Sequence, residues 1–309
     1  MTCRLFGGSR WPRWGALAGG FLLCVSLLLG LARAAQNPSP TAPESKGSEL
    51  FQRVVANQKR TDESLDLFER IERQEIRKTG SDVKPAEVKA WRVFPAGVAN
   101  YRIPLSAEGR PISAESYRAD LQKLEKLLVW AMQQGPGQDE ALAKLARKRK
   151  ERNDLIEAMH AAFIFTLVGH EMRGERSLVK YSMAPNPQFK PASRNATLFT
   201  KIKGFIWIDE ESSELAKVEG EVSQDISLSL FLAKVYKGSH FMQERYEMAP
   251  GIWLPTFQQY DFDGRKFLLP FSVHERTFYT NYRRVGPPKE ALKVVRGELG
   301  KADRETAGP

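Results

Sequence analysis

The spacing of hydrophobic residues divides the chain near residue 160 into a helical part and a strand part. Over 113–160 the apolar residues recur every three or four positions, which places them on one face of a helix. They are Tyr117, Leu121, Leu124 and Leu128 in a first helix and Leu142, Leu145, Ile156 and Met159 in a second. A break at Gly135–Gly137 separates the two, so the sequence predicts a helical hairpin over 113–160, with Ser113 capping its first helix.

After residue 160 apolar and polar residues alternate, and turn residues recur at intervals of roughly 10–14 positions, which indicates antiparallel strands. Asp263-Gly264 and Lys237-Gly238 are typical of hairpin turns. The series begins with the alternation around Phe163, Phe165 and Leu167. The further predicted strands are Arg176–Ala184, Leu198–Asp209, Leu215–Val222, Ile226–Val235, Ser239–Met248, Gly251–Phe262, Lys266–Phe271 and Val273–Val285.

Shorter elements are predicted before the hairpin. Ser48 caps a helix that ends near Lys59, and its apolar face consists of Leu50, Phe51, Val54 and Val55. Leu65–Lys78 is open between a helix, which its Glu, Arg and Leu content favours, and a strand, which its partial alternation favours. Lys84–Phe94 and Val98–Leu105 are predicted to form two strands joined by a short turn.

Strands of about 12 residues span roughly 40 Å, and antiparallel sheets of such strands curl because of their intrinsic twist. A curled sheet has a concave side that other elements must fill. The sequence therefore predicts an α+β fold: a large curled antiparallel sheet, or incomplete barrel, with the N-terminal helix and the helical hairpin covering its concave side.

The first 34 residues have the pattern of a cleaved secretory signal peptide. Arginines precede an apolar block from Ala16 to Leu31, and Ala32-Arg33-Ala34 provides a small-x-small cleavage site. A transmembrane anchor is the alternative, but the block is short and rich in glycine, whereas a spanning helix needs about 20 mostly apolar residues. We expect an exported protein of the periplasm or envelope, with a flexible linker over 35–47, one domain over 48–285 and a C-terminal tail over 286–309.

Charge and cysteine content narrow the function classes. The full chain has a formal charge of +10, and without the four arginines of residues 1–34 about +6 remains. Cys3 and Cys24 both lie in the expected signal peptide, so neither a disulfide nor a thiolate is expected afterwards. A basic run could contact an anionic membrane surface or a partner, or could simply be a solvated helix face; it consists of Arg147, Lys148, Arg149, Lys150 and Arg152. Nucleic acid is not an expected partner of an exported chain.

Several segments resemble a known family. They are KIKGFIWIDEESSELAKVEGEV (Lys201–Val222), YEMAPGIWLPTFQQYDFDGRKF (Tyr246–Phe267), YTNYRRV (Tyr279–Val285), GRPIS (Gly109–Ser113) and MAPNPQFKP (Met183–Pro191). Together they resemble the lipoprotein-localisation carrier superfamily of LolA-like folds, and more closely an uncharacterised group of exported bacterial envelope proteins with that sheet. The resemblance implies an incomplete barrel around an apolar cavity for acyl chains, and it implies that Leu65–Lys78 is a strand. The inserted hairpin over 113–160 departs from the carriers.

Motifs for catalysis or metal binding are weak. The segment HEMRGE (His170–Glu175) lacks the second histidine at i+4 that a zinc protease motif has, and Asp261 to Gly264 lacks the further ligands of a calcium loop. Glu210-Glu211 after Asp209 are typical of a solvated turn. We therefore expect no catalytic residues, no metal, no cofactor and no enzymatic activity.

Aromatic residues on the strands are the remaining candidates for a site. They could line an acyl-chain cavity, or they could pack the sheet against the helices; they are Phe163, Phe165, Phe205, Trp207, Phe241, Tyr246 and Trp253. Two functions follow from these alternatives. The first is the binding or carrying of lipid or lipoprotein acyl chains in an open apolar cavity. The second is a non-enzymatic scaffold or protein-interaction module of the envelope with a filled, closed cup.

Overall fold

The computed structural model describes residues 45–78, 87–107, 110–193, 195–228, 233–267 and 269–306. The signal peptide expected over 1–34, and most of the linker expected over 35–47, lie outside these residues. The described residues all belong to one compact unit of the chain.

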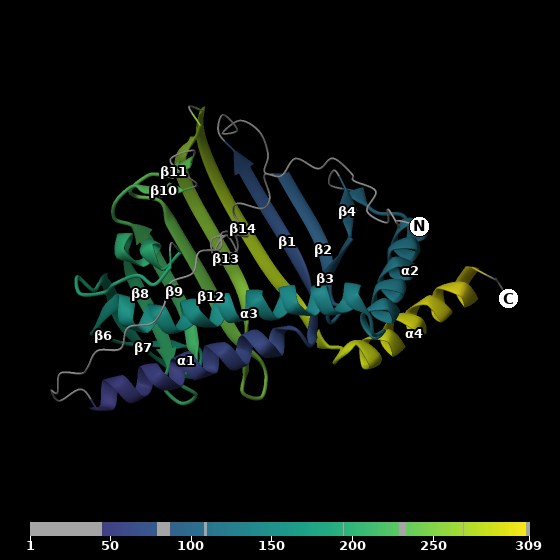
Figure 1. Ribbon diagram of the computed structural model, residues 1–309, viewed down its shortest axis with the longest axis horizontal. Coiled ribbons are helices and arrows are strands. Elements are labelled where there is room, and N and C mark those ends of the chain that lie inside the picture. The colour runs from purple at the N-terminus through teal and green to yellow at the C-terminus, as the bar shows by residue number, and fades with distance from the viewer. Residues whose placement is uncertain are drawn as a thin grey trace. The chain divides into compact units, whose positions relative to one another are not determined.

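A 12-stranded antiparallel sheet dominates this unit (Figure 1). Its main path has the order β3-β2-β1-β14-β13-β12-β9-β8-β7-β6, and β10 and β11 join it through β13. The strands of the main path are β1 (Phe68–Lys78), β2 (Glu87–Pro95), β3 (Asn100–Pro104), β6 (Phe163–Arg173), β7 (Arg176–Pro185), β8 (Ile202–Asp209), β9 (Leu215–Val222), β12 (His240–Ala249), β13 (Ile252–Lys266) and β14 (Leu269–Arg284). The short strands are β4 (Ser106–Ala107), β5 (Arg110–Pro111), β10 (Ile226–Leu228) and β11 (Ala233–Val235). The sheet is not closed, because β3 and β6 are not paired with each other, and the predicted α+β fold is confirmed.

The helices are α1 (Ser45–Leu65), α2 (Ala114–Ala131), α3 (Pro136–Ala162), the short 3₁₀ helix η1 (Ala196–Lys201) and α4 (Pro288–Thr306). Ser113 caps α2 as expected, because its side chain accepts a hydrogen bond from the backbone N–H of Ser116. Among the described residues, no helix is long and apolar enough to cross a membrane.

Two expectations about the helices need correction. The helices of 113–160 form, but α2 packs against α4 and β3, whereas α3 packs against α1, so they are not a hairpin of mutually packed helices. The C-terminal tail expected over 286–309 is instead α4, whose residues Ala291, Leu292 and Val295 are buried. Their apolar side chains share a core with Leu121, Leu124 and Leu128 of α2.

The segment left open between helix and strand is a strand inside the sheet. β1 pairs with β2 on one side and with β14 on the other. Hydrogen bonds to the strands on both sides satisfy the backbone N–H and C=O groups of this charged segment. Helix propensity alone would not predict a strand here. The strand that the LolA-like resemblance implies is thereby confirmed.

Helix α1 extends beyond the predicted end near Lys59, because its second half pairs with α3. Asp62 forms an ion pair with Arg152 at 3.0 Å, and Asp66 forms one with Arg149 at 2.5 Å. Lys59 contacts Glu157 in the same way. Since rising numbers on one helix meet falling numbers on the other, α1 and α3 are antiparallel neighbours (Figure 1).

The strand register assigns each side chain to a face of the sheet, because directly paired residues point to the same side and successive residues point to opposite sides. Phe51 of α1 stacks on Phe165 of β6 with ring centroids 4.3 Å apart, and it contacts Tyr181 of β7 at 5.3 Å. We call the face that carries these two residues the inner face and the opposite one the outer face. At the β2–β3 end, α2 and α4 pack on the outer face.

Candidate functional site

Polar side chains cross the centre of the inner face in a continuous row. Gln74, Thr277, Gln258 and Gln243 are directly paired neighbours on β1, β14, β13 and β12. We call these four residues the polar row. The last three are buried, with 6%, 8% and 7% of their surface exposed. At this position the inner face therefore carries amides and a hydroxyl, not apolar side chains.

The polar row is held by hydrogen bonds to its neighbours on the same face. Gln74 donates to Glu275 at 2.6 Å, and Thr277 donates to the same carboxylate at 3.3 Å. Gln258 accepts from the hydroxyl of Tyr279 at 2.7 Å. Burial raises the pKa of Glu275, and this effect outweighs the two hydrogen bonds that lower it. Because these groups satisfy one another, this part of the inner face is a preorganised polar layer, beside buried apolar residues of the same face such as Ile206 and Ile208 of β8.

Charged residues continue this layer toward the N-terminal end of β1. Arg70 donates to Glu72 at 2.9 and 2.6 Å, and Arg102 donates to the other oxygen of Glu72 at 2.7 Å. The side chains of Arg70 and Glu72 are only 8% and 5% exposed. A buried carboxylate that contacts two guanidinium groups is fully compensated, so this group stabilises the arrangement of β1 and β3.

The seven aromatic candidates are divided between the two faces. Phe163, Phe165 and Phe241 lie on the inner face, where Phe165 is covered by Phe51. Phe205 and Trp207 lie on the outer face. Trp207 shares a buried cluster with Leu178, Ala216 and Trp253. Tyr246 is 40% exposed. The seven residues therefore cannot all line one cavity, because alternate positions of a strand face opposite sides.

Cations lie over the outer-face aromatic rings. The Nζ atoms of Lys180 and Lys217 are each 4.7 Å from the Trp207 ring centroid, and Lys180 is also 5.0 Å from Phe205. Glu171 accepts from both Lys180 and the Trp207 indole, and these hydrogen bonds lower its pKa. Such contacts contribute about 0.5–2 kcal/mol each, so lysine side chains cover part of these two rings on the outer face.

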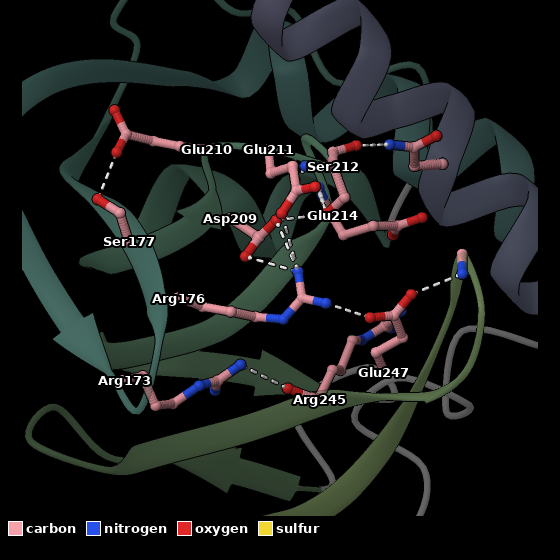
Figure 2. A network of polar contacts seen from close by, with 12 residues as sticks. Arg173, Arg176, Ser177, Asp209, Glu210, Glu211, Ser212, Glu214, Arg245 and Glu247 are labelled. Atoms are coloured by element: carbon pink, nitrogen blue, oxygen red, sulfur yellow. Dashed lines mark hydrogen bonds and ion pairs between the residues drawn. The ribbon is translucent and has the colours of Figure 1, made fainter.

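Figure 2 shows a network of polar contacts around the turn between β8 and β9. Asp209, 1% exposed, accepts from the backbone N–H of Ser212 at 2.9 Å and from its hydroxyl at 2.7 Å. Arg176 donates to Asp209 at 3.3 Å and also pairs with Glu247 of β12. The predicted solvated turn is therefore only partly correct, because Asp209 is a buried anchor of its own turn.

Helix α1 is attached to the same turn. Asn57 donates to the backbone carbonyls of Ser212 and Ser213 at 3.0 Å, and Arg60 donates to Glu214 at 2.8 Å. Burial raises the pKa of Glu214, although Arg60 opposes the shift. These contacts fix α1 over the sheet ends, so the helix covers the inner face as a part of the fold.

The basic run is only partly available to a membrane or partner. Arg149 and Arg152 pair with Asp66 and Asp62 of α1, and Lys150 pairs with Asp154 of its own helix at 2.8 Å. Arg147 and Lys148 are exposed. Sequence spacing could not show that part of the run faces acids on a helix some 90 residues earlier.

Sequence reasoning missed a cleft beside a bulge in β14. Two residues of β14, one of them Asn281 with a φ of 53°, lie opposite one residue of β1. The extra residue turns Arg283 to the outer face. There Arg92 and Arg283 both contact Glu69 of β1 and Glu298 of α4. The cleft has a volume of about 370 Å³ and is lined by Glu69, Arg70, Ile71, Arg92, Asn281, Tyr282 and Arg283. None of the seven aromatic candidates lines it.

Ser272, His274 and Asp261 form a chain of contacts on the outer face. The serine Oγ lies 3.1 Å from His274 Nε2, and His274 Nδ1 lies 2.7 Å from an Asp261 oxygen. The order matches that of serine hydrolases, but the imidazole is 43% exposed on a strand surface and the 370 Å³ cleft is lined by other residues. Acyl transfer also requires donors for the oxyanion in a water-excluded site, so these contacts alone do not make a catalytic centre. Among the described residues, no three His, Cys, Asp or Glu side chains are grouped to hold a metal ion.

Comparison with known proteins gives likenesses of fold. No family model and no curated protein matches the chain. A LolA superfamily protein from Nitrosomonas europaea has a TM-score of 0.33 at 8% identity, covering 79% of this chain and 96% of its own. A DUF1329 family protein from Desulfovibrio piger has a TM-score of 0.28 at 11% identity, covering 77% and 92%. A structure of MucB in complex with MucA(peri) has a TM-score of 0.22 at 8% identity, covering 75% and 93%.

Proposed function

We propose that the protein is an exported envelope component that acts as a non-enzymatic protein-interaction module with a closed cup. The observation that supports this proposal is the polar row, which occupies the place where a carrier of acyl chains would present apolar side chains. Phe51 of α1 packs on the same inner face, so helix and sheet are in direct contact there.

The energetics of the inner face favour the closed cup over acyl-chain binding. A bound chain gains about 0.8 kcal/mol for each methylene group that it buries. On this face it would separate polar groups from their partners, and a buried polar group without a partner costs about 1–3 kcal/mol. Two such groups already lie on α1, because Gln58 Nε2 and Thr61 Oγ1 are buried without a hydrogen-bond partner. Each polar group that lost its partner would therefore offset the burial of about one to four methylene groups of the chain.

Export is the part of the proposal that rests on the sequence alone. The apolar block from Ala16 to Leu31 and the site Ala32-Arg33-Ala34 support cleavage of a signal peptide. Mass spectrometry of the protein from the envelope fraction is expected to find an N-terminal peptide that begins at Ala35. A chain in the same fraction that still carries residues 1–34 would contradict cleavage.

Acyl-chain binding is tested with native mass spectrometry and a dansyl-labelled fatty acid. We expect the mass of the polypeptide alone and no saturable rise in dansyl fluorescence. Two matched variants locate any uptake: Phe241→Ser changes the inner face, and Phe278→Ser changes the outer face. Saturable uptake that Phe241→Ser abolishes and Phe278→Ser retains would overturn the closed cup in favour of an acyl-chain carrier.

A further inference from the structure

Strand β6 forms one edge of the sheet and is 11 residues long. It pairs with β7 along one side. Within the described residues, no strand pairs with its other side. An edge of this kind presents a row of backbone N–H and C=O groups, and the ligand that matches such a row is an extended polypeptide.

The side chains of β6 are unusually apolar for an exposed strand. Ile164, Leu167, Val168 and Met172 are 51%, 56%, 54% and 68% exposed. The register places Ile164 on the outer face and Leu167 on the inner face. Natural edge strands are commonly protected by charged residues; β6 carries the half-exposed His170 and Glu171, but it also presents apolar side chains on both faces of the sheet.

Acidic residues gather at the C-terminal end of β6. Glu175 in the turn to β7 is exposed. Glu211, in the turn between β8 and β9, is 90% exposed and lies 3.9 Å from Arg176 of β7. Glu210 is 43% exposed and lies 3.3 Å from His170 of β6. An antiparallel strand added to this edge would bring its N-terminal end beside these carboxylates, where basic residues are complementary.

We propose that β6 binds an extended protein segment that joins the sheet as an antiparallel strand, with apolar residues along its length and basic residues at its N-terminal end. The proposal rests on the interaction module proposed above and names the kind of partner. A register shift between Leu167 and Gly169 divides the edge into two short stretches, which sets the alignment of the added strand.

The test uses a synthetic peptide, acetyl-KKTVTVTIT-amide, and its acidic counterpart, acetyl-EETVTVTIT-amide. Binding is followed by fluorescence anisotropy, and hydrogen–deuterium exchange locates the contact on the whole protein. We expect the basic peptide to bind more tightly than the acidic one and to slow exchange in β6. Absence of binding by the basic peptide, or protection confined to other strands, would overturn the proposal.

Variants at exposed positions separate edge binding from general stickiness. Ile164→Lys and Met172→Lys are expected to weaken binding of the basic peptide at least about ten-fold. Leu269→Lys is the matched control, because Leu269 is 72% exposed on a different strand, β14. An equal loss in all three variants would contradict a site on β6.

Exchanging the charge at the end of β6 provides a second test, which concerns the orientation of the bound peptide. Replacing Glu175 and Glu210 by lysine should reverse the order of the two peptides, because Glu175 follows β6 in the turn and Glu210 lies 3.3 Å from His170 of β6. An unchanged order would refute the proposed orientation. The fatty-acid experiment distinguishes failure of this proposal from failure of the closed cup. Uptake of the fatty acid without peptide binding would contradict both the closed cup and the edge-strand proposal. Absence of both kinds of binding would contradict only the edge-strand proposal.

Discussion

Replacing Arg92 by methionine tests the charged group that joins the sheet to α2 and α4. The Arg92 side chain is 9% exposed, and it donates to Glu69 at 2.7 Å, to Glu298 at 2.6 and 3.0 Å and to the hydroxyl of Tyr117 at 2.6 Å. Burial lowers the pKa of Arg92, but the hydrogen bond with Glu298 and the charge of Glu69 outweigh it and raise the pKa. Methionine keeps the packing over Phe94 but leaves Glu69 with Arg283 as its remaining cation.

The expected loss is about 3–5 kcal/mol in the free energy of unfolding, the usual cost of removing one partner from a buried ion pair. Equilibrium denaturation in urea measures it, with Arg73→Met as the control. The Arg73 side chain is 50% exposed and pairs with Glu75, so its loss should cost less than about 1 kcal/mol. Adding Glu69→Gln to Arg92→Met should recover part of the loss. A change below about 1 kcal/mol for Arg92→Met, or strict additivity with Glu69→Gln, would refute the reasoning.

The remaining predictions concern stability and reactivity. Because the folded-state pKa of Glu275 is raised, its contribution to stability falls as pH rises above the usual carboxyl value, so Glu275→Gln should flatten this loss of stability with rising pH in urea titrations; an unchanged slope would contradict this. Gly204→Ala should destabilise by roughly 1–3 kcal/mol, because its Cβ would lie 1.9 Å from the Glu219 carbonyl oxygen. Gly297→Ala, in open space on α4, should instead stabilise the protein by about 0.5–1 kcal/mol. Similar shifts in melting temperature for Gly204→Ala and Gly297→Ala would argue against the close approach of β8 and β9 at Gly204. A fluorophosphonate probe should leave Ser272 unlabelled, and labelling that Ser272→Ala removes would establish a reactive serine.

Periodicity in the sequence located most strands and the buried face of α2. The stripe Leu121, Leu124 and Leu128 is buried as predicted, because a helix face depends only on local spacing. The faces of the strands could not be assigned in this way. Phe165 and Phe205 look equivalent in the sequence. Their strands, β6 and β8, both pair with β7, and the two registers place these residues on opposite faces of the sheet.

Long-range pairing explains the other differences. The polar row draws its members from four strands, and Gln74 lies about 200 residues from Thr277 in sequence. Helix α1 continues to Leu65 because Asp62 and Asp66 meet arginines of α3, which no local signal indicates. By contrast, the apolar positions Ala291, Leu292 and Val295 at helical spacing could have predicted α4 from the sequence.

Thiol labelling tests the closed cup most directly. In a background with Cys3→Ser and Cys24→Ser the chain has no cysteine, so a single one can be placed at Gln258 on the inner face or at Gln259 on the outer face. Gln258 is 8% exposed on the inner face. We expect a maleimide to react with Gln258→Cys at least about ten-fold more slowly than with Gln259→Cys, and we expect urea to remove the difference. Equal rates in the folded protein would show an open inner face and contradict the account.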